Sequence, residues 1–283
     1  MVQRIGKAWL AAAVALFLWS SDSLALFENE GLSARYLSLG GGCTALSDEP
    51  CAMASNPAAM GFYQKKGVQL SWSQLFNMKE LSSGDLYFAY HPGSTFSGND
   101  LTLGLGLNIF GQPDYYQETT LSFTLGYTVR SYLALGTSIK YMQASFSSPY
   151  PDLSAVSYDL GVLVRVREGI QIGAGIKNLN KPQMVSDSED VPRVWHLGAA
   201  LHPFEGIILT IDLVKDSDFE HQLRFGQEIA LFESLSLRFG MATEPVTYAL
   251  GGGLRWEKGK MDYVLLGHPT LGGSSKISFS FQW

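Results

Sequence analysis

Apolar residues alternate with small or polar residues along most of the chain after Lys66. The clearest stretch is 101–109, in which Leu or Ile occupies every odd position and Thr, Gly or Asn every even one. Successive side chains of a β-strand point to opposite faces, so this stretch predicts a strand with one apolar face and one small or polar face. The stretches 121–129, 170–177 and 235–241 repeat the pattern.

The same pattern predicts fourteen strands separated by turn-forming residues. Their lengths are close to the roughly 9–11 residues with which a tilted strand crosses a bilayer. An even number of strands suits a closed barrel with both ends on one side of the membrane. We therefore predict an all-β fold, a closed antiparallel transmembrane β-barrel with strands near 67–76, 84–91, 100–110, 119–130, 132–146, 154–167, 169–178, 193–203, 206–215, 220–231, 234–243, 247–257, 260–267 and 274–283.

The connections between the predicted strands tend to alternate in length, although the turn at 92–99 breaks the rule and some outer loops are short. In outer-membrane barrels the short turns face the periplasm and the longer loops face outside. Tight turns are expected at Arg130-Ser131, Glu168, Phe204-Glu205, Phe232-Glu233 and Lys258-Gly259, and longer loops at 76–83, 111–118 and 179–192.

A secreted β-sandwich also has alternating strands and is the alternative fold. A sandwich exposes a charged face, whereas the second face of these strands is rich in glycine and hydroxyl side chains. Glycine inside a strand marks curvature or the close approach of another backbone. This face therefore favours a lumen wall with another segment packed against it. Its glycines are Gly104, Gly106, Gly126, Gly136, Gly161, Gly173, Gly175, Gly198, Gly226, Gly240, Gly251 and Gly253.

Residues 1–25 have the features of a signal peptide. Arg4 and Lys7 precede an apolar run over 8–19, and Ser23-Leu24-Ala25 supplies the small residues of a cleavage site. A membrane anchor is the alternative, but this run is too short to span about 30 Å of hydrocarbon. We therefore expect export and cleavage after Ala25. No later stretch has the roughly 18 uninterrupted apolar residues of a transmembrane helix.

The composition agrees with a membrane barrel. Hydrophobic residues make up 46% of the chain and charged residues 16%, against roughly 25% charged in ordinary soluble domains. The apolar content argues against disorder, and a net charge of −6 argues against a nucleic-acid partner. Outer-membrane lipid is the partner that this composition predicts.

Residues 26–64 lack the alternation and are predicted to form a plug inside the barrel, which itself spans 65–283. The segment contains Gly40-Gly41-Gly42, several alanines and the turn Asn56-Pro57, which suit short helical pieces against a glycine-lined wall. Barrels of about 8 strands are filled by their own side chains, and those of about 16–18 leave an aqueous channel. A lumen of intermediate size would leak without a plug.

Cys43 and Cys51 both lie in this segment. Two nearby cysteines in an exported chain favour a disulfide that closes a small loop. The alternative is two small buried thiols that do not meet, because sequence carries no geometry.

The sequence has no motif of a catalytic, cofactor or metal site. Three of its five histidines precede proline at predicted strand ends, which indicates turns, and none has metal-ligand spacing. The nucleophile elbow, the P-loop and the paired-histidine zinc motif are all missing. We expect a protein that is not an enzyme and that needs no cofactor.

Charged residues in the small-residue register are expected to point into the lumen. Such residues would make a solvated lumen with salt bridges that tether the plug. A substrate path or a contact with a cargo peptide is the alternative. They are Lys140, Asp159, Arg165, Lys177, Asp212, Arg224, Glu228, Arg238, Arg255 and Asp262. On the lipid side, aromatic girdles are expected from Trp72, Tyr127, Tyr141, Tyr158, Trp195, Tyr248 and Trp256.

The chain ends in a strand that has Ile277, Phe279, Phe281 and Trp283 on one face. An unpaired apolar edge strand is a template for pairing with another strand. This strand resembles the terminal signal through which outer-membrane proteins are recognised by the barrel-assembly machinery.

Two parts of the chain carry a family resemblance. The first is Gly41–Ala45 with Asp48, Ala52 and Asn56-Pro57-Ala58-Ala59-Met60, and the second is a series of strand segments within 193–283. Together they resemble the PorV/PorQ family, which is related to FadL-type outer-membrane transporters. The resemblance implies a fourteen-stranded barrel associated with type IX secretion, whose partners are secretion components and secreted cargo bound for the cell surface.

Two function classes follow from the sequence. One is a non-enzymatic component of protein secretion, as the resemblance implies. The other is a FadL-like transporter of hydrophobic small molecules, which would have a connected apolar pocket or a lateral opening between strands.

Overall fold

The computed structural model describes residues 27, 31–93, 100–113, 115–185, 189–217 and 221–283. The predicted signal peptide at 1–25 lies outside these residues. None of the helices in this part of the chain is long and apolar enough to cross a membrane.

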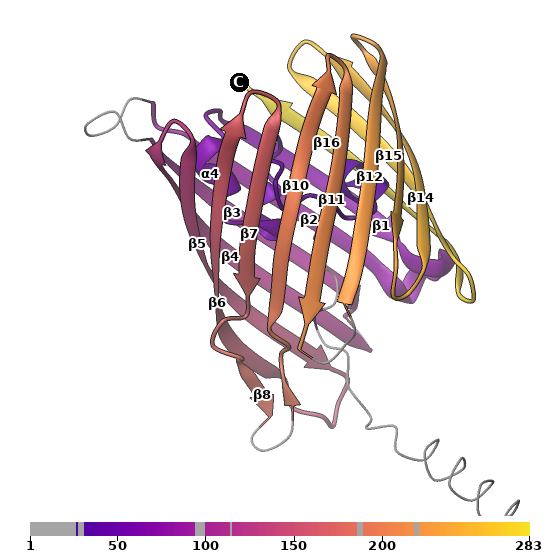
Figure 1. Ribbon diagram of the computed structural model, residues 1–283. Coiled ribbons are helices and arrows are strands. Elements are labelled where there is room, and N and C mark those ends of the chain that lie inside the picture. The colour runs from indigo at the N-terminus through magenta and orange to yellow at the C-terminus, as the bar shows by residue number, and fades with distance from the viewer. Residues whose placement is uncertain (1–26, 28–30, 94–99, 114, 186–188, 218–220) are drawn as a thin grey trace, which may run out of the picture.

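The structure is a closed antiparallel barrel of fourteen strands, which confirms the predicted fold (Figure 1). Each strand pairs with its neighbours along the chain, and the last strand pairs with the first to close the barrel. The barrel strands are β1 Gly67–Gln74, β2 Ser82–Tyr90, β3 Leu101–Gln112, β4 Tyr116–Arg130, β5 Leu133–Phe146, β6 Leu153–Arg167, β7 Ile170–Lys177, β10 Val194–Phe204, β11 Ile207–Asp216, β12 His221–Phe232, β13 Leu235–Ala242, β14 Thr247–Trp256, β15 Gly259–His268 and β16 Gly272–Gln282.

The alternation of the sequence becomes an apolar exterior and a small or polar interior. On β3, Leu105 is 49% exposed, whereas Thr102 in the other register is fully buried. The same division recurs on β14 with Leu250 outside and Ala249 inside. Because hydrophobic side chains cover the outer surface of the wall, this surface is suited to contact with lipid. The seven aromatic residues predicted for the girdles are all exposed: Trp72, Tyr127, Tyr141, Tyr158, Trp195, Tyr248 and Trp256.

A short hairpin, β8 Gln183–Val185 with β9 Glu189–Asp190, interrupts the connection from β7 to β10. It lies at the end of the barrel opposite the C terminus (Figure 1). Two 3-10 turns, Leu75–Asn77 and Lys79–Leu81, connect β1 to β2. We call this end of the barrel the loop end, and the opposite end, with the tight turns and the C terminus, the turn end.

Residues 31–64 precede β1 and contain three short helices, α2 Ala34–Ser38, α3 Ala52–Ser55 and α4 Ala59–Phe62. Ser33 caps α2, since its hydroxyl accepts a hydrogen bond from the Tyr36 N–H at 3.2 Å. Nearly every side chain of this segment is buried, and these side chains make up most of the largest hydrophobic cluster among the described residues. We call this segment the plug. The hydrophobic core of the protein lies where the plug packs against the inner wall of the barrel.

Candidate binding site in the barrel lumen

The plug packs directly against the inward-facing glycines of the barrel wall. A Cβ atom at Gly136 would overlap the backbone of Pro57, and one at Gly240 would overlap the backbone of Gly40. Such close approach of two backbones explains why the strands carry glycine in this register. The helix α4 contacts β3, β4 and β5, and α2 contacts β13 to β16 on another part of the wall.

The turn Asn56-Pro57 joins α3 to α4 and docks on β6. The Asn56 side-chain oxygen accepts a hydrogen bond from the Ala58 N–H at 3.0 Å. Its amide group donates to the carbonyl oxygens of Thr44 at 2.9 Å and Val162 at 3.1 Å. One side chain therefore links two parts of the plug to the barrel wall.

Charged side chains fasten the plug to β12 and join β12 to β13 and β13 to β15. The Arg35 guanidinium lies 2.7 Å from a carboxylate oxygen of Glu228 and 2.8 Å from Asp48. Arg238 pairs with the same Glu228 at 2.6 Å and with Asp262 at 2.8 Å. Arg35 and Arg238 are almost fully buried, so these ion pairs are shielded from water.

Glu49 is a second charged anchor of the plug. Its carboxylate accepts hydrogen bonds from Lys260 at 2.8 Å, Ser33 at 2.8 Å and Gln69 at 2.9 Å. Burial alone would raise the pKa of the Glu49 carboxyl, but the charges of Lys260 and Arg35 hold that pKa below its usual value. Glu49 is therefore a buried carboxylate rather than a neutral acid.

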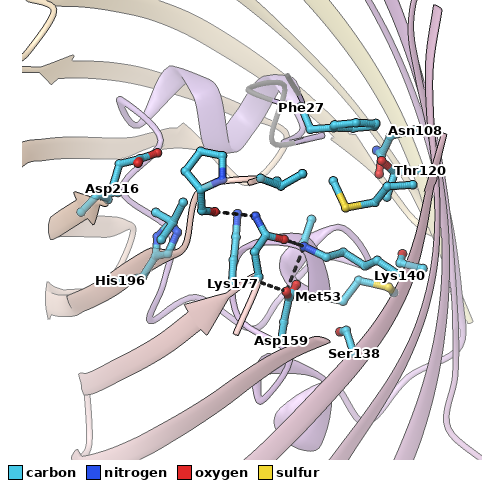
Figure 2. A pocket seen from close by; sticks show the side chains of 18 of the residues that line it. Phe27, Met53, Asn108, Thr120, Ser138, Lys140, Asp159, Lys177, His196 and Asp216 are labelled. Carbon is cyan, nitrogen blue, oxygen red and sulfur yellow. Dashed lines mark hydrogen bonds and ion pairs between the residues drawn. The ribbon is translucent and has the colours of Figure 1, made fainter. Parts of the chain in front are cut away.

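The plug leaves space in the lumen toward the loop end, and a cavity of about 340 Å³ lies there. We call it the mouth cavity. Figure 2 shows Lys140 and Asp159 pointing toward each other across its floor, with Met53 of the plug close by. The Lys140 ammonium lies 2.9 Å from Asp159 and donates to the Asn178 side chain at 2.9 Å. The Asn178 amide in turn donates to the Pro192 carbonyl at 2.8 Å.

Residues Asn178, Val191 and Pro192 of the β7–β10 connection line this cavity. Met184 and Val191 from the connection pack with Met142 of β5 in a small buried cluster, and Phe27 lies against it. The Phe27 N–H donates to the Glu118 carboxylate at 2.9 Å. Phe27 and the described residues of the β7–β10 connection, Met184 and Val191, therefore lie over the mouth cavity.

A second cavity, of about 500 Å³, lies beside the mouth cavity and is mainly apolar. We call it the apolar cavity. Its apolar lining includes residues of the plug, of the β1–β2 connection and of four strands: Leu32, Leu37, Leu75, Phe76, Leu81, Phe110, Ala242, Ala249 and Leu266. The two cavities share Gln222 and Arg224 as lining residues, so these two side chains stand between them.

The other predicted lumen charges occupy varied places. Lys177 lines the mouth cavity, and Asp212 accepts a hydrogen bond from the Thr44 N–H of the plug at 2.9 Å. The Arg165 guanidinium stacks over the Phe62 ring of α4 at 3.8 Å from its centroid. Arg255 is exposed at the turn end of β14.

Sequence reasoning missed several charged partners. Lys260, and the ion pair of Lys276 with Asp85, occupy the inward register of their strands, so the alternation could have identified them. Arg35 and Glu49 lie in the plug, which has no periodicity from which their direction could be deduced.

The two cysteines are not joined in the structure, contrary to the predicted disulfide. Cys43 and Cys51 are both buried free thiols. The Cys43 thiol donates to the Gly41 carbonyl at 3.4 Å, whereas the Cys51 sulfur lies 3.8 Å from the Glu49 carboxylate. Burial and the nearby Glu49 raise the pKa of the Cys51 thiol, which keeps it protonated. The structure therefore has the alternative arrangement, in which two buried thiols are packed separately within the plug.

The last strand has its aromatic residues on the outer face. Phe279, Phe281 and Trp283 are exposed, and Ile277 in the same register is partly exposed. Within the described residues, no three His, Cys, Asp or Glu side chains gather as a metal site requires. Of the histidines, His196 is buried and lines the mouth cavity.

Neither a family model nor a curated protein matches the chain. Solved structures do. The toluene transporter TodX of Pseudomonas putida aligns with a TM-score of 0.65 and 12% identity, over 91% of this chain and 99% of that chain. A FadL homologue of Pseudomonas aeruginosa aligns with a TM-score of 0.59 and 12% identity, over 86% of this chain and 95% of that chain.

The fold is that of the FadL-type barrels. At 12% identity the similarity concerns the fold alone. The comparisons give no support to the PorV/PorQ family specifically, nor to type IX secretion.

Proposed function

We propose that this barrel is an outer-membrane channel for small hydrophobic molecules. The observation that carries the proposal is the apolar cavity of about 500 Å³ between the plug and the wall. Ligand sites are typically concave, largely apolar and equipped with a few polar groups that fix orientation. The polar lining here includes Glu118, His268 and Lys276, together with Arg224 and Gln222, which also border the mouth cavity.

A path through the protein would begin at the mouth cavity. A solute would pass Met53 and Phe27, reach the polar pair Gln222 and Arg224, and enter the apolar cavity. Passage to the far side then requires the plug to move, since residues 31–64 fill the turn end. The similarity of fold to a protein described as a toluene transporter supports this choice over other roles for a plugged barrel.

The location that we propose is the outer membrane of a Gram-negative-type cell, after export by the predicted signal peptide. The apolar exterior and its exposed aromatic residues support a lipid environment. We propose that β16, with Ile277, Phe279, Phe281 and Trp283 toward the outside, is the strand that the barrel-assembly machinery recognises.

The proposed transport can be tested by filling the apolar cavity. Ala242 of β13 is buried and lines this cavity, whereas Met241 beside it has its side chain on the outer face. A phenyl ring at this position would occupy space that a solute needs, so Ala242→Phe should weaken occupancy about tenfold, which corresponds to about 1.4 kcal/mol. Met241→Phe adds an aromatic ring to the same strand without entering the cavity.

The measurement is the uptake of toluene by lipid vesicles that contain the purified protein. We expect Ala242→Phe to lower the saturable uptake about tenfold and Met241→Phe to leave it unchanged. Equal uptake by native protein and protein-free vesicles would overturn the proposal. Equal uptake by the two variants would show that the solute does not pass through the apolar cavity.

A role in secretion is a second proposal, and it rests on the PorV/PorQ resemblance alone. In that role, secretion components or secreted cargo would bind the loop end. Co-purification of such proteins with the full chain from native membranes would support this role. Toluene uptake without any such co-purification would favour the channel.

A further inference from the structure

The outer face of the barrel wall has a hollow of about 460 Å³ over β6, β7, β10 and β11. Two rungs of paired residues border it. The rung nearer the loop end is Leu160, Ile176, Trp195 and Lys215, and the next rung is Val162, Ala174, Leu197 and Leu213. Apart from Lys215 and His196, the residues that line it are apolar or glycine.

The hollow results from one small side chain among large ones. Ala174 is the smallest of these eight residues, and its neighbours Leu197 and Trp195 are 52% and 49% exposed. The strands β7 and β10 stay paired through this region, so the hollow is a recess in a continuous wall. Apolar atoms that border an empty space lose their dispersion contacts on that side, so an occupant is favoured.

The surroundings define the chemistry of the occupant. The recess faces the lipid side of the wall, where acyl chains are the available apolar groups. Lys215 lies one residue before the loop-end terminus of β11 and pairs directly with Trp195 of β10. Trp is enriched where a membrane meets water, and a Lys near that surface attracts anionic headgroups.

We propose that this recess is a binding site for one anionic, phosphate-bearing bilayer lipid in the leaflet at the loop end. One acyl chain would fill the space above Ala174 between Leu160 and Leu197. The phosphate would lie at the Lys215 ammonium, beside the Trp195 ring. The site is on the outer wall and does not depend on transport through the lumen.

The test is native mass spectrometry of the full-length mature barrel in a neutral detergent. The probes are phosphatidylglycerol and phosphatidylcholine with identical acyl chains, each added over a range of concentrations. We expect one saturable phosphatidylglycerol molecule per barrel and weaker retention of phosphatidylcholine. Removing the cation with Lys215→Gln should reduce the preference for phosphatidylglycerol about fivefold, because one basic residue near the membrane contributes about 1 kcal/mol.

A second set of variants fills the recess and is measured in the same lipid-binding experiment. Ala174→Leu, or the smaller Ala174→Val if the first variant does not fold, should remove the saturable binding of both lipids. Two matched variants should bind as the native protein does. Gly252→Leu adds the same side chain to the outer face of β14, and Lys79→Gln removes an exposed cation outside the recess.

Several results would overturn the proposal. Binding that never saturates would show only general lipid solvation of the wall. Unchanged binding in Ala174→Leu would place the lipid elsewhere. A dimer that dissociates in Ala174→Leu would assign the recess to a second copy of this chain.

Discussion

At the residue scale, the attachment of the plug depends on a few buried ion pairs. Arg35 contacts both Glu228 on the wall and Asp48 in the plug, so it connects two parts of the chain that are far apart in sequence. Glu228 also pairs with Arg238, and Glu49 with Lys260. Glu228 and Glu49 thus each have two cations near them, since Arg35 also lies 3.6 Å from Glu49.

Replacing Arg35 with methionine should destabilise the plugged state. Removing one partner of a buried ion pair costs about 3–5 kcal/mol, and we expect the lower end of that range because Glu228 keeps Arg238 and Glu49 keeps Lys260. Urea unfolding in lipid vesicles measures the change in the free energy of unfolding. Arg255→Met is the matched control, since Arg255 is exposed, and it should change that free energy by less than about 0.5 kcal/mol. Equal effects of the two variants would contradict the role given to Arg35.

The charge of Glu49 predicts a dependence of stability on pH. The native state holds the pKa of Glu49 below its usual 4.5, so the carboxylate stabilises the folded protein fully above about that pH. This contribution is lost as the pH falls from about 4.5 through the lowered native pKa. The free energy of unfolding should therefore fall as the pH drops below about 4.5, and fall less steeply in Glu49→Gln. Parallel pH profiles for the native protein and this variant would be evidence against the assignment.

At the scale of the elements, glycine in the inward register lets short helices approach the strands. The helices α3 and α4 have four residues each and would not be stable alone, so the wall must hold them. The turn between them at Pro57 lies against Gly136 of β5. The residues at these strand positions are glycines because a larger side chain would overlap the plug backbone.

Substituting Gly136 with alanine should force the plug away from β5. The added Cβ would overlap the Pro57 backbone, and overpacking of this kind costs about 1–3 kcal/mol. Hydrogen exchange of the α3 and α4 amides should accelerate accordingly. Gly252→Ala is the control, because the nearest atom to its Cβ is 3.8 Å away and the position faces outward. Exchange in the control should match that of the native protein.

At the scale of the whole molecule, the fourteen strands enclose a lumen, and the plug and other segments fill part of it. The plug fills the turn end, the two cavities lie toward the loop end, and the β7–β10 connection and Phe27 cover part of the mouth. Flow of water through such a lumen is restricted, and an apolar solute has a compartment to enter. This division of the interior is the arrangement on which the proposed channel function rests.

The number and order of the strands could be predicted from the sequence because they depend on local alternation. Each apolar residue at 101–109 must avoid water, and a strand places all of them on one face. The glycine positions likewise indicated a segment packed on the inner wall. Turn residues such as Arg130-Ser131 marked the ends of strands.

The tertiary structure alone decided which side chains meet. Arg35 and Glu228 are 193 positions apart, and no local pattern relates a residue of a short plug helix to one on β12. The separation of the Cys43 and Cys51 thiols, the β8–β9 hairpin and the two cavities also depend on how the plug settles in the barrel. Alternation determines which way a strand side chain points, whereas contacts between distant segments depend on the packing of the complete chain.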